Sequence, residues 1–208
     1  MATVAFFCPN LLQFNREEKM ITGIILTGGK SQRMGKEKGL CHFRGLMLVE
    51  YAIKTLLPLC DELILSANNK LDEYRQFGYP VVSDILPDSG PIGGLYSGLL
   101  ASKTELNLVI SCDTPFVTTA LFTELIKHIN NFQSVVPIHE TKFIEPLTAC
   151  YKKSCLPIIK SQIETGHFKM TDLLDKLNTH YLEVNATLPE IGVSMFHNLN
   201  TPEDLLSC

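Results

Sequence analysis

The segment between residues 26 and 38 carries the glycines and cations that a phosphate-binding loop needs. It reads LTGGKSQRMGKEK, with glycines at positions 28, 29 and 35 and cations at positions 30, 33, 36 and 38. Glycine lets backbone N–H groups approach an anion closely, and Lys and Arg side chains neutralise its charge. The segment is not a Walker A loop, because Ile24 stands where that loop has a glycine. Phosphate binding is the favoured interpretation, and a solvent-exposed basic loop is the alternative.

Two aspartates and an asparagine follow apolar segments that read as buried strands. Asp113 comes two residues after LNLVIS, Asp84 directly after PVVS, and Asn68 two residues after ELILS. A carboxylate that faces a cationic loop at the edge of a sheet is suited to Mg²⁺. The same residue types also cap helices and form turns, which are the structural alternatives for all three.

These candidate residues depend on strands and helices that alternate along the chain. Apolar, β-branched runs predict strands at 21–27, 62–66, 80–83, 106–111, 134–137 and 147–151. Helical spacing predicts helices at 46–57, 72–77, 91–102, 118–130, 155–165 and 171–177. This alternation predicts an α/β fold with a single doubly wound, mostly parallel sheet and helices on both faces. Ligands of such Rossmann-like sheets bind at the carboxyl ends of the strands, so the loops after residues 27, 83 and 111 form the candidate site.

The composition of the 208-residue chain is that of an ordinary globular domain, with 45% hydrophobic and 19% charged residues. We expect residues 20–208 to form one domain and residues 1–19 to be a dispensable extension. The net charge of −4 leaves no basic excess for nucleic acid, and no apolar run reaches the roughly 18 residues of a membrane span. The seven cysteines are scattered without a C-x-x-C pair, which argues against a zinc site and fits a reducing cytoplasm.

The loop at residues 26–40, LTGGKSQRMGKEKGL, resembles the signature loop of the molybdenum cofactor guanylyltransferases, which have a nucleotide-diphospho-sugar-transferase fold. It departs from the family pattern in having Glu37 where the family mostly has Asp, and Thr27 where it mostly has Ala. Four later segments are also similar to the family, in the order GPIGGL, CDTPF, EPLTACY and NLNTPEDL. The resemblance therefore extends over about residues 21–206.

The resemblance implies transfer of GMP from GTP to the terminal phosphate of molybdenum-bound molybdopterin, which releases pyrophosphate and forms molybdopterin guanine dinucleotide. It implies that Asp113 holds Mg²⁺ and that Arg33 and Lys38 stabilise charge on the phosphates. The nucleotide-binding positions that it implies are Leu26, Thr27, Gly28, Gly29, Lys38, Asn68, Asp84 and Asp113. Weaker candidates near the acceptor are Asn198, Asn200, His167 and Lys169.

Base selection can be assigned to Asp84 by its chemistry, and the resemblance implies that Asn68 is a base-contacting position. Guanine presents adjacent N–H donors on N1 and N2, and one carboxylate can accept both, whereas cytosine lacks this pair. We therefore expect Asp84 to recognise guanine, with the amide of Asn68 donating to an acceptor on the base.

Two alternative functions stay open on the sequence. A related nucleotidyltransferase could use CTP or another nucleotide and act on the molybdenum cofactor or on a sugar phosphate. A GTP-binding protein without catalysis is the other, although Arg33, Lys38 and Asp113 are all present. The expected partners are GTP, molybdopterin and the molybdoenzymes that receive the product, in the cytoplasm and with Mg²⁺ as cofactor. Neither nucleic acid nor a membrane is an expected partner.

Overall fold

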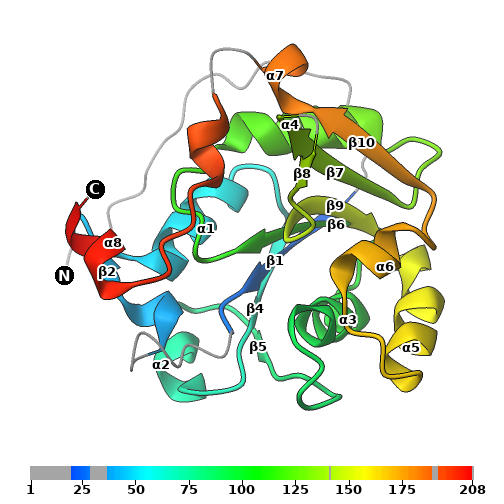
Figure 1. Cartoon of the computed structure of the whole chain (residues 1–208). Helices are drawn as coiled ribbons and strands as arrows, with labels where there is room; N and C mark the ends of the chain where they lie inside the picture. Colours follow the sequence, from blue (N-terminus) through cyan, green and yellow to red (C-terminus); the bar gives the residue numbers. More distant parts are fainter. Residues whose placement is uncertain (1–19, 29–36, 141, 189–191, 208) are drawn as a thin grey trace.

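The computed structural model of the chain describes residues 20–28, 37–140, 142–188 and 192–207. The expected N-terminal extension, residues 1–19, lies outside these ranges. Figure 1 shows a central twisted sheet with helices packed against both of its faces.

The central sheet is mostly parallel, as the sequence predicts. Its order is β10-β7-β9-β6-β1-β4-β5, and β8 pairs with β7. Strand β9 runs antiparallel between β6 and β7, whereas β6, β1, β4 and β5 are parallel. The strands are β1 (Ile21–Leu26), β4 (Glu62–Ser66), β5 (Val81–Val82), β6 (Leu106–Ser111), β7 (Ser134–His139), β8 (Phe143–Ile144), β9 (Thr148–Lys152) and β10 (Thr179–Glu183).

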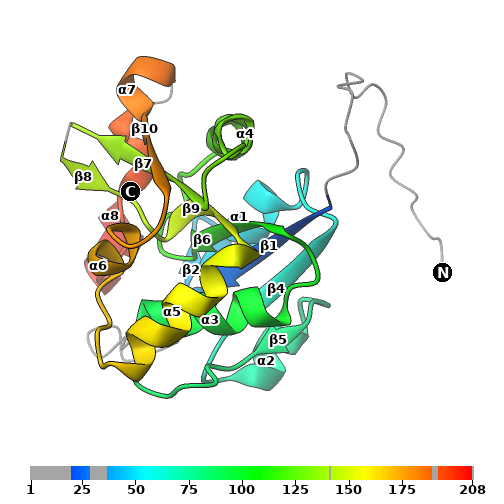
Figure 2. The same ribbon diagram turned by 90° about the vertical axis from the view of Figure 1, so that its right-hand side faces the viewer.

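The helices divide between the two faces of the sheet because the side chains of the central strands alternate. In β1, Ile21 and Ile25 pack into the core beneath α1 (Leu48–Leu56) and α4 (Thr119–His128). Ile24 and Leu26 pack on the opposite face, beneath α3 (Pro91–Ala101), α5 (Leu156–Glu164) and α6 (Met170–Leu174). Figure 2 shows α3 and α5 running side by side. Both faces of β1 are thus buried, which explains its continuous apolar sequence.

Short elements complete the chain. They are α2 (Leu71–Arg75), α7 (Val184–Thr187) and α8 (Pro202–Ser207), with 3₁₀ turns η1 (Lys38–Leu40), η2 (Lys153–Cys155) and η3 (Val193–Phe196). Within the part of the chain that the structure describes, none of the helices is long and apolar enough to cross a bilayer.

The helix expected at 46–57 begins two residues later than the sequence suggests. Residues 46 and 47 instead form β3 (Leu46–Met47), which pairs with β2 (His42–Phe43) in a hairpin. Positive φ angles of 46° at Arg44 and 88° at Gly45 form its two-residue turn, a geometry that favours hairpins. The Met47 N–H then donates to Glu50 Oε2 at 2.7 Å, and the helix begins at Leu48.

Two glycines of α3 allow this helix to approach the central strands closely. A Cβ added at Gly98 would lie 2.5 Å from Cγ2 of Ile24, and one at Gly94 would lie 3.1 Å from Oγ of Ser66. A larger residue at Gly98 would therefore push α3 away from β1. The glycines place the first turns of α3 beside the carboxyl ends of β1 and β4, where the candidate site lies.

Candidate active site

A cavity of about 1400 Å³ opens at the carboxyl ends of the parallel strands. Residues that end or follow four of these strands line it, among them Leu26, Gly28, Ser66, Asn68, Asp84 and Ser111. This is the edge of the sheet at which the topology predicts a ligand. Pockets for one small molecule usually enclose about 300–1000 Å³, so this cavity has room for more than one.

One side of the cavity holds a reciprocal pair of hydrogen bonds. Asn68 Nδ2 donates to Asp84 Oδ2 at 2.8 Å, and the Asp84 N–H donates to Asn68 Oδ1 at 2.8 Å. Burial raises the pKa of the Asp84 carboxyl, and the hydrogen bond from Asn68 opposes that rise. A Cβ at Gly93 would lie 3.3 Å from Asp84 Oδ2, so glycine keeps space beside the carboxylate. The two residues expected to recognise the base are thus already in contact and face the cavity.

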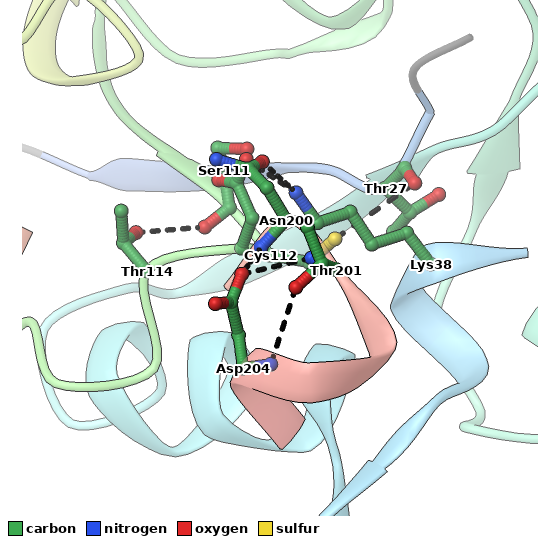
Figure 3. A network of polar contacts seen from close by, with 9 residues as sticks. Thr27, Lys38, Ser111, Cys112, Thr114, Asn200, Thr201 and Asp204 are labelled. Carbon is green, nitrogen blue, oxygen red and sulfur yellow. Dashed lines mark hydrogen bonds and ion pairs between the residues drawn. The ribbon is translucent and has the colours of Figure 1, made fainter. Parts of the chain in front are cut away.

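A second group joins three distant parts of the chain. The ammonium of Lys38 lies 2.9 Å from Asp113 Oδ2 and 2.7 Å from Asn200 Oδ1. The Lys38 side chain is 13% exposed and that of Asp113 21%, so the ion pair is largely shielded from water. Figure 3 shows the Lys38 side chain reaching across to Asn200. The structure therefore brings two expected catalytic residues, Lys38 and Asp113, into contact and adds Asn200 to them.

Hydrogen bonds at the start of α8 hold Asn200 in this position. Asp204 Oδ2 accepts from the N–H groups of Asn200 and Thr201 at 2.7 and 2.8 Å, and Thr201 Oγ1 accepts from the Asp204 N–H at 3.2 Å. The bonds from these two backbone N–H groups hold the pKa of the Asp204 carboxyl below its usual value. The neighbouring Leu199 N–H donates to the backbone oxygen of Asp113 at 2.9 Å. The C-terminal segment is thereby fixed directly to the residue expected to hold a metal.

The departure at Thr27 from the family pattern has a structural role. Its hydroxyl and its N–H both donate to the backbone oxygen of Ser66, at 2.9 and 3.0 Å, which ties the end of β1 to the end of β4. The thiol of Cys112 contacts the Thr27 oxygen at 3.8 Å and is buried. Burial raises the pKa of this thiol well above its usual value, so Cys112 is a core residue rather than a nucleophile.

The departure at Glu37 places a longer carboxylate in the cavity wall. Glu37 lines the cavity, and the hydroxyl of the buried Tyr74 lies 3.5 Å from its Oε1. Burial raises the pKa of the Glu37 carboxyl, while hydrogen bonds from Tyr74 and Asn69 and the charge of Lys70 oppose the rise. The extra methylene of Glu is thus accommodated against the pocket beneath α2.

His139 and Glu145 form a pair that the sequence analysis did not identify. His139 Nε2 lies 2.9 Å from Glu145 Oε1, and its ring stacks on Phe196 at 4.8 Å between centroids. Burial raises the pKa of the Glu145 carboxyl, and the charge of Asp113 adds to that rise while His139 opposes it. Strand β9 starts beside the end of β6, and this antiparallel register brings Glu145 to the same edge as Asp113. The segment EPLTACY was the only sequence signal for this placement.

Other expected residues are less closely tied to the site. Gly29 and Arg33 lie outside the described residues. Asn198 is exposed on the segment before α8, and His167 and Lys169 flank Phe168, which lines the cavity. Within the described ranges, no three His, Cys, Asp or Glu side chains gather as a ready-made metal site.

Comparisons with known proteins agree with this arrangement. The family model described as the MobA-like NTP transferase domain matches residues 23–180. The probable molybdenum cofactor guanylyltransferase of Flavobacterium johnsoniae is 39% identical over 188 residues, covering 89% of this chain and 94% of the relative. The molybdenum cofactor guanylyltransferase of Vibrio cholerae is 32% identical over 184 residues, covering 88% of each chain.

A solved structure shows the same fold. The molybdopterin-guanine dinucleotide biosynthesis protein A of Archaeoglobus fulgidus matches with a TM-score of 0.74 and 25% identity, over 89% of this chain and 95% of that one. The family model, the sequence relatives and the fold thus confirm the resemblance drawn from the signature loop. The chain belongs to the MobA-like NTP transferase family, among the relatives of the molybdenum cofactor guanylyltransferases.

Proposed function

We propose that the protein transfers GMP from GTP to the terminal phosphate of molybdenum-bound molybdopterin, releasing pyrophosphate and forming molybdopterin guanine dinucleotide. The observation that carries the proposal is one edge of the central sheet, at the carboxyl ends of its parallel strands, that holds both a base-reading pair and a charged cluster. Asn68 and Asp84 form the pair, and Lys38, Asp113 and Asn200 form the cluster. The names of the relatives supply the acceptor.

The reaction needs no general base on the protein. A phosphate monoester has its second pKa near ~6, so the acceptor phosphate is already an anion at neutral pH. One of its oxygens attacks the α-phosphorus of GTP in line, a new P–O bond forms, and the bond to the pyrophosphate oxygen breaks. Catalysis then depends on alignment and on neutralising the phosphate charges. Lys38 and Arg33 are the cations that we assign to this task.

Asp113 and Asn200 fit a divalent cation. Their oxygens are hard ligands of the kind that Mg²⁺ takes, and both already face one positive group, the ammonium of Lys38. When bound, Mg²⁺ would supply positive charge against the triphosphate. Asp113 is the residue that we assign to hold it, and Asp204 keeps Asn200 beside it.

Guanine selection is assigned to Asp84 and Asn68. Asn68 donates to Oδ2 of Asp84, which orients the carboxylate and leaves Oδ1 able to accept from the base. Cytosine and uracil do not offer two adjacent N–H donors, so the same carboxylate discriminates against CTP and UTP. The backbone from Leu26 to Gly29 is assigned to the nucleotide phosphates and sugar. We further propose a cytoplasmic enzyme whose product passes to molybdoenzymes.

Calorimetry with GTP, CTP, ATP and UTP, each with and without Mg²⁺, tests the proposal. We expect selective GTP binding that Mg²⁺ strengthens, and an Asp84→Asn variant should lose about 30-fold of the preference for GTP over UTP, or ~2 kcal/mol. The same variant should keep the part of the binding affinity that comes from the triphosphate group, because the charged cluster is unchanged. Preference for CTP or UTP in the natural protein would overturn the assignment of guanine. Pyrophosphate release that requires both GTP and molybdopterin completes the test.

A further inference from the structure

One large aromatic side chain faces the cavity without a role in the scheme above. Phe168 lies between α5 and α6, lines the cavity and is 43% exposed. An exposed phenyl ring costs free energy in water, and a ring inside a ligand cavity has a flat apolar face ready for another ring. Leu147 lines the same cavity and packs against the hydrophobic core.

The loop that carries Phe168 is held at both ends by one buried glutamine. Gln162 is 1% exposed, and its Nε2 donates to the backbone oxygen of Lys169 at 2.9 Å. Its own backbone oxygen accepts from the His167 N–H at 3.1 Å, and Gly166 turns the chain with a φ of 75°. The ring is thus presented by a hydrogen-bonded turn, which lowers the entropy lost when a ligand stacks on it.

The sheet order separates Leu147 from Asn68 of the base-reading pair. Asn68 follows β4, whereas Leu147 directly precedes β9, and strands β1 and β6 lie between β4 and β9. At about 4.8 Å per strand this separation is roughly 14 Å. The loop of Phe168 connects α5 and α6, which Figure 1 shows on the opposite side of β1 from α2. Leu147 and the loop of Phe168 are therefore both separated from Asn68 across β1, and each contributes an apolar side chain to the cavity lining.

We propose that Phe168 stacks on the flat pterin ring of the phosphate acceptor and thereby positions its phosphate for attack. The inference deepens the proposed function and rests on it for the nature of the acceptor. A nucleotide whose base is bound by Asp84 leaves open the part of the cavity beside Phe168. The volume of the cavity also exceeds the volume that one small ligand fills. A pterin is a planar bicyclic ring, and stacking on an aromatic side chain is the usual way in which proteins hold such faces.

The test compares Phe168→Ala with Phe168→Tyr and with a matched control, Tyr181→Ala. Tyr181 is a ring of similar exposure, 40%, on β10. Binding is followed by quenching of the fluorescence of 6-hydroxymethylpterin in the presence of GTP, and turnover is followed with molybdenum-bound molybdopterin. We expect Phe168→Ala to weaken pterin binding and to raise the acceptor KM by roughly tenfold. The GTP affinity should stay within about twofold, and Phe168→Tyr and Tyr181→Ala should match the natural protein.

Every other outcome of this experiment either overturns or upholds the role of Phe168 in acceptor binding. A loss of GTP affinity with an unchanged acceptor KM would assign the ring to the nucleotide, and no change in either quantity would leave it without a substrate; both overturn the inference. An absence of pterin binding by the natural protein overturns it as well. Pterin binding that depends on Phe168 in a protein without guanylyl transfer would uphold the inference and reject the proposed function.

Discussion

The base-reading pair and the charged cluster differ in how the chain brings their residues together. Asn68 and Asp84 are 16 residues apart and follow the neighbouring strands β4 and β5. Lys38 contacts Asp113 and Asn200, which lie 75 and 162 residues away in the sequence, and Asp204 accepts a hydrogen bond from the Asn200 N–H. The base selection that we propose would therefore rest on a local pair that satisfies its own hydrogen bonds. The charged cluster instead forms only when residues from distant parts of the chain come together in the folded domain.

The largest expected effect comes from removing a charge in the cluster. Lys38→Ala or Asp113→Ala should lower turnover at least ~100-fold, about 2.7 kcal/mol of transition-state stabilisation, because the proposed mechanism depends on neutralising the phosphate charges. The Asp113 backbone oxygen still accepts from Leu199 in the alanine variant, so thermal unfolding should stay near that of the natural protein. The ratio of GTP to UTP affinity should also be preserved. Turnover near the natural rate in both variants would contradict the roles that the mechanism gives to Lys38 and Asp113.

A smaller effect should follow when the cluster is intact but less well held. Asp204→Ala removes the acceptor for the N–H groups of Asn200 and Thr201, and Asn200 then loses its fixed position beside Lys38. We expect turnover to fall about tenfold and the Mg²⁺ concentration for half-maximal rate to rise, since one positioning hydrogen-bond set is worth ~1–2 kcal/mol. Steady-state kinetics over a Mg²⁺ series measure both quantities.

The neighbouring Glu203 provides the control for that variant. Glu203 is exposed in the first turn of α8 and makes the same contribution of charge near the helix start. Glu203→Ala should leave turnover within about twofold, because helix-dipole effects at an exposed site are small. Equal losses in the two variants would mean that α8 acts through its charge and not by placing Asn200. A changed preference for GTP in Asp204→Ala would break the separation between the two parts of the site.

The strands could be predicted from the sequence where both of their faces are buried, because such strands have a continuous run of apolar residues. Strands β1, β4 and β6 are of this kind, and their positions were predicted to within a residue. Strand β10 was missed because it lies at the edge of the sheet and reads THYLE, with a single buried residue, Leu182. The hairpin of β2 and β3 was missed because the apolar Leu46 and Met47 also fit helical spacing. Its only signal is the Arg44-Gly45 turn.

The candidate site residues could be predicted from the sequence where a charged side chain stands in a loop that follows a strand. Asp84 and Asp113 follow β5 and β6 within two residues, and the topology sends both carboxylates to the same edge. Lys38 belongs to the glycine-rich and cationic segment that follows β1. Sequence could not show that Asp204 holds Asn200, because a helix cap accounts for the same residues equally well. The pairing of His139 with Glu145 was missed for another reason. It follows from the antiparallel register of β9, which has no local signature.

The smallest expected effect separates the two parts of the site by pH. Burial raises the pKa of Asp84, and only its ionised carboxylate accepts both guanine donors. The ratio of GTP to UTP affinity should therefore fall as the pH is lowered from neutral and this carboxylate becomes protonated, and the fall should begin at a higher pH than for an ordinary aspartate. Protonation of the triphosphate affects both nucleotides and cancels in this ratio. Calorimetric titrations at each pH measure it, and Asp84→Asn should make it independent of pH.

The same pKa shift affects the stability of the free protein in the opposite direction: GTP preference should rise with pH, whereas the contribution of Asp84 to stability should fall. Because the pKa of Asp84 is higher in the folded state than in the unfolded chain, folding favours the protonated form. The contribution of this carboxyl to the free energy of unfolding is present below its unfolded pKa and is lost as the pH rises through its folded pKa. GTP preference should thus strengthen over the pH range in which this contribution disappears. A GTP to UTP ratio that stays constant with pH in the natural protein would remove Asp84 from base recognition and leave it as a turn residue beside Asn68.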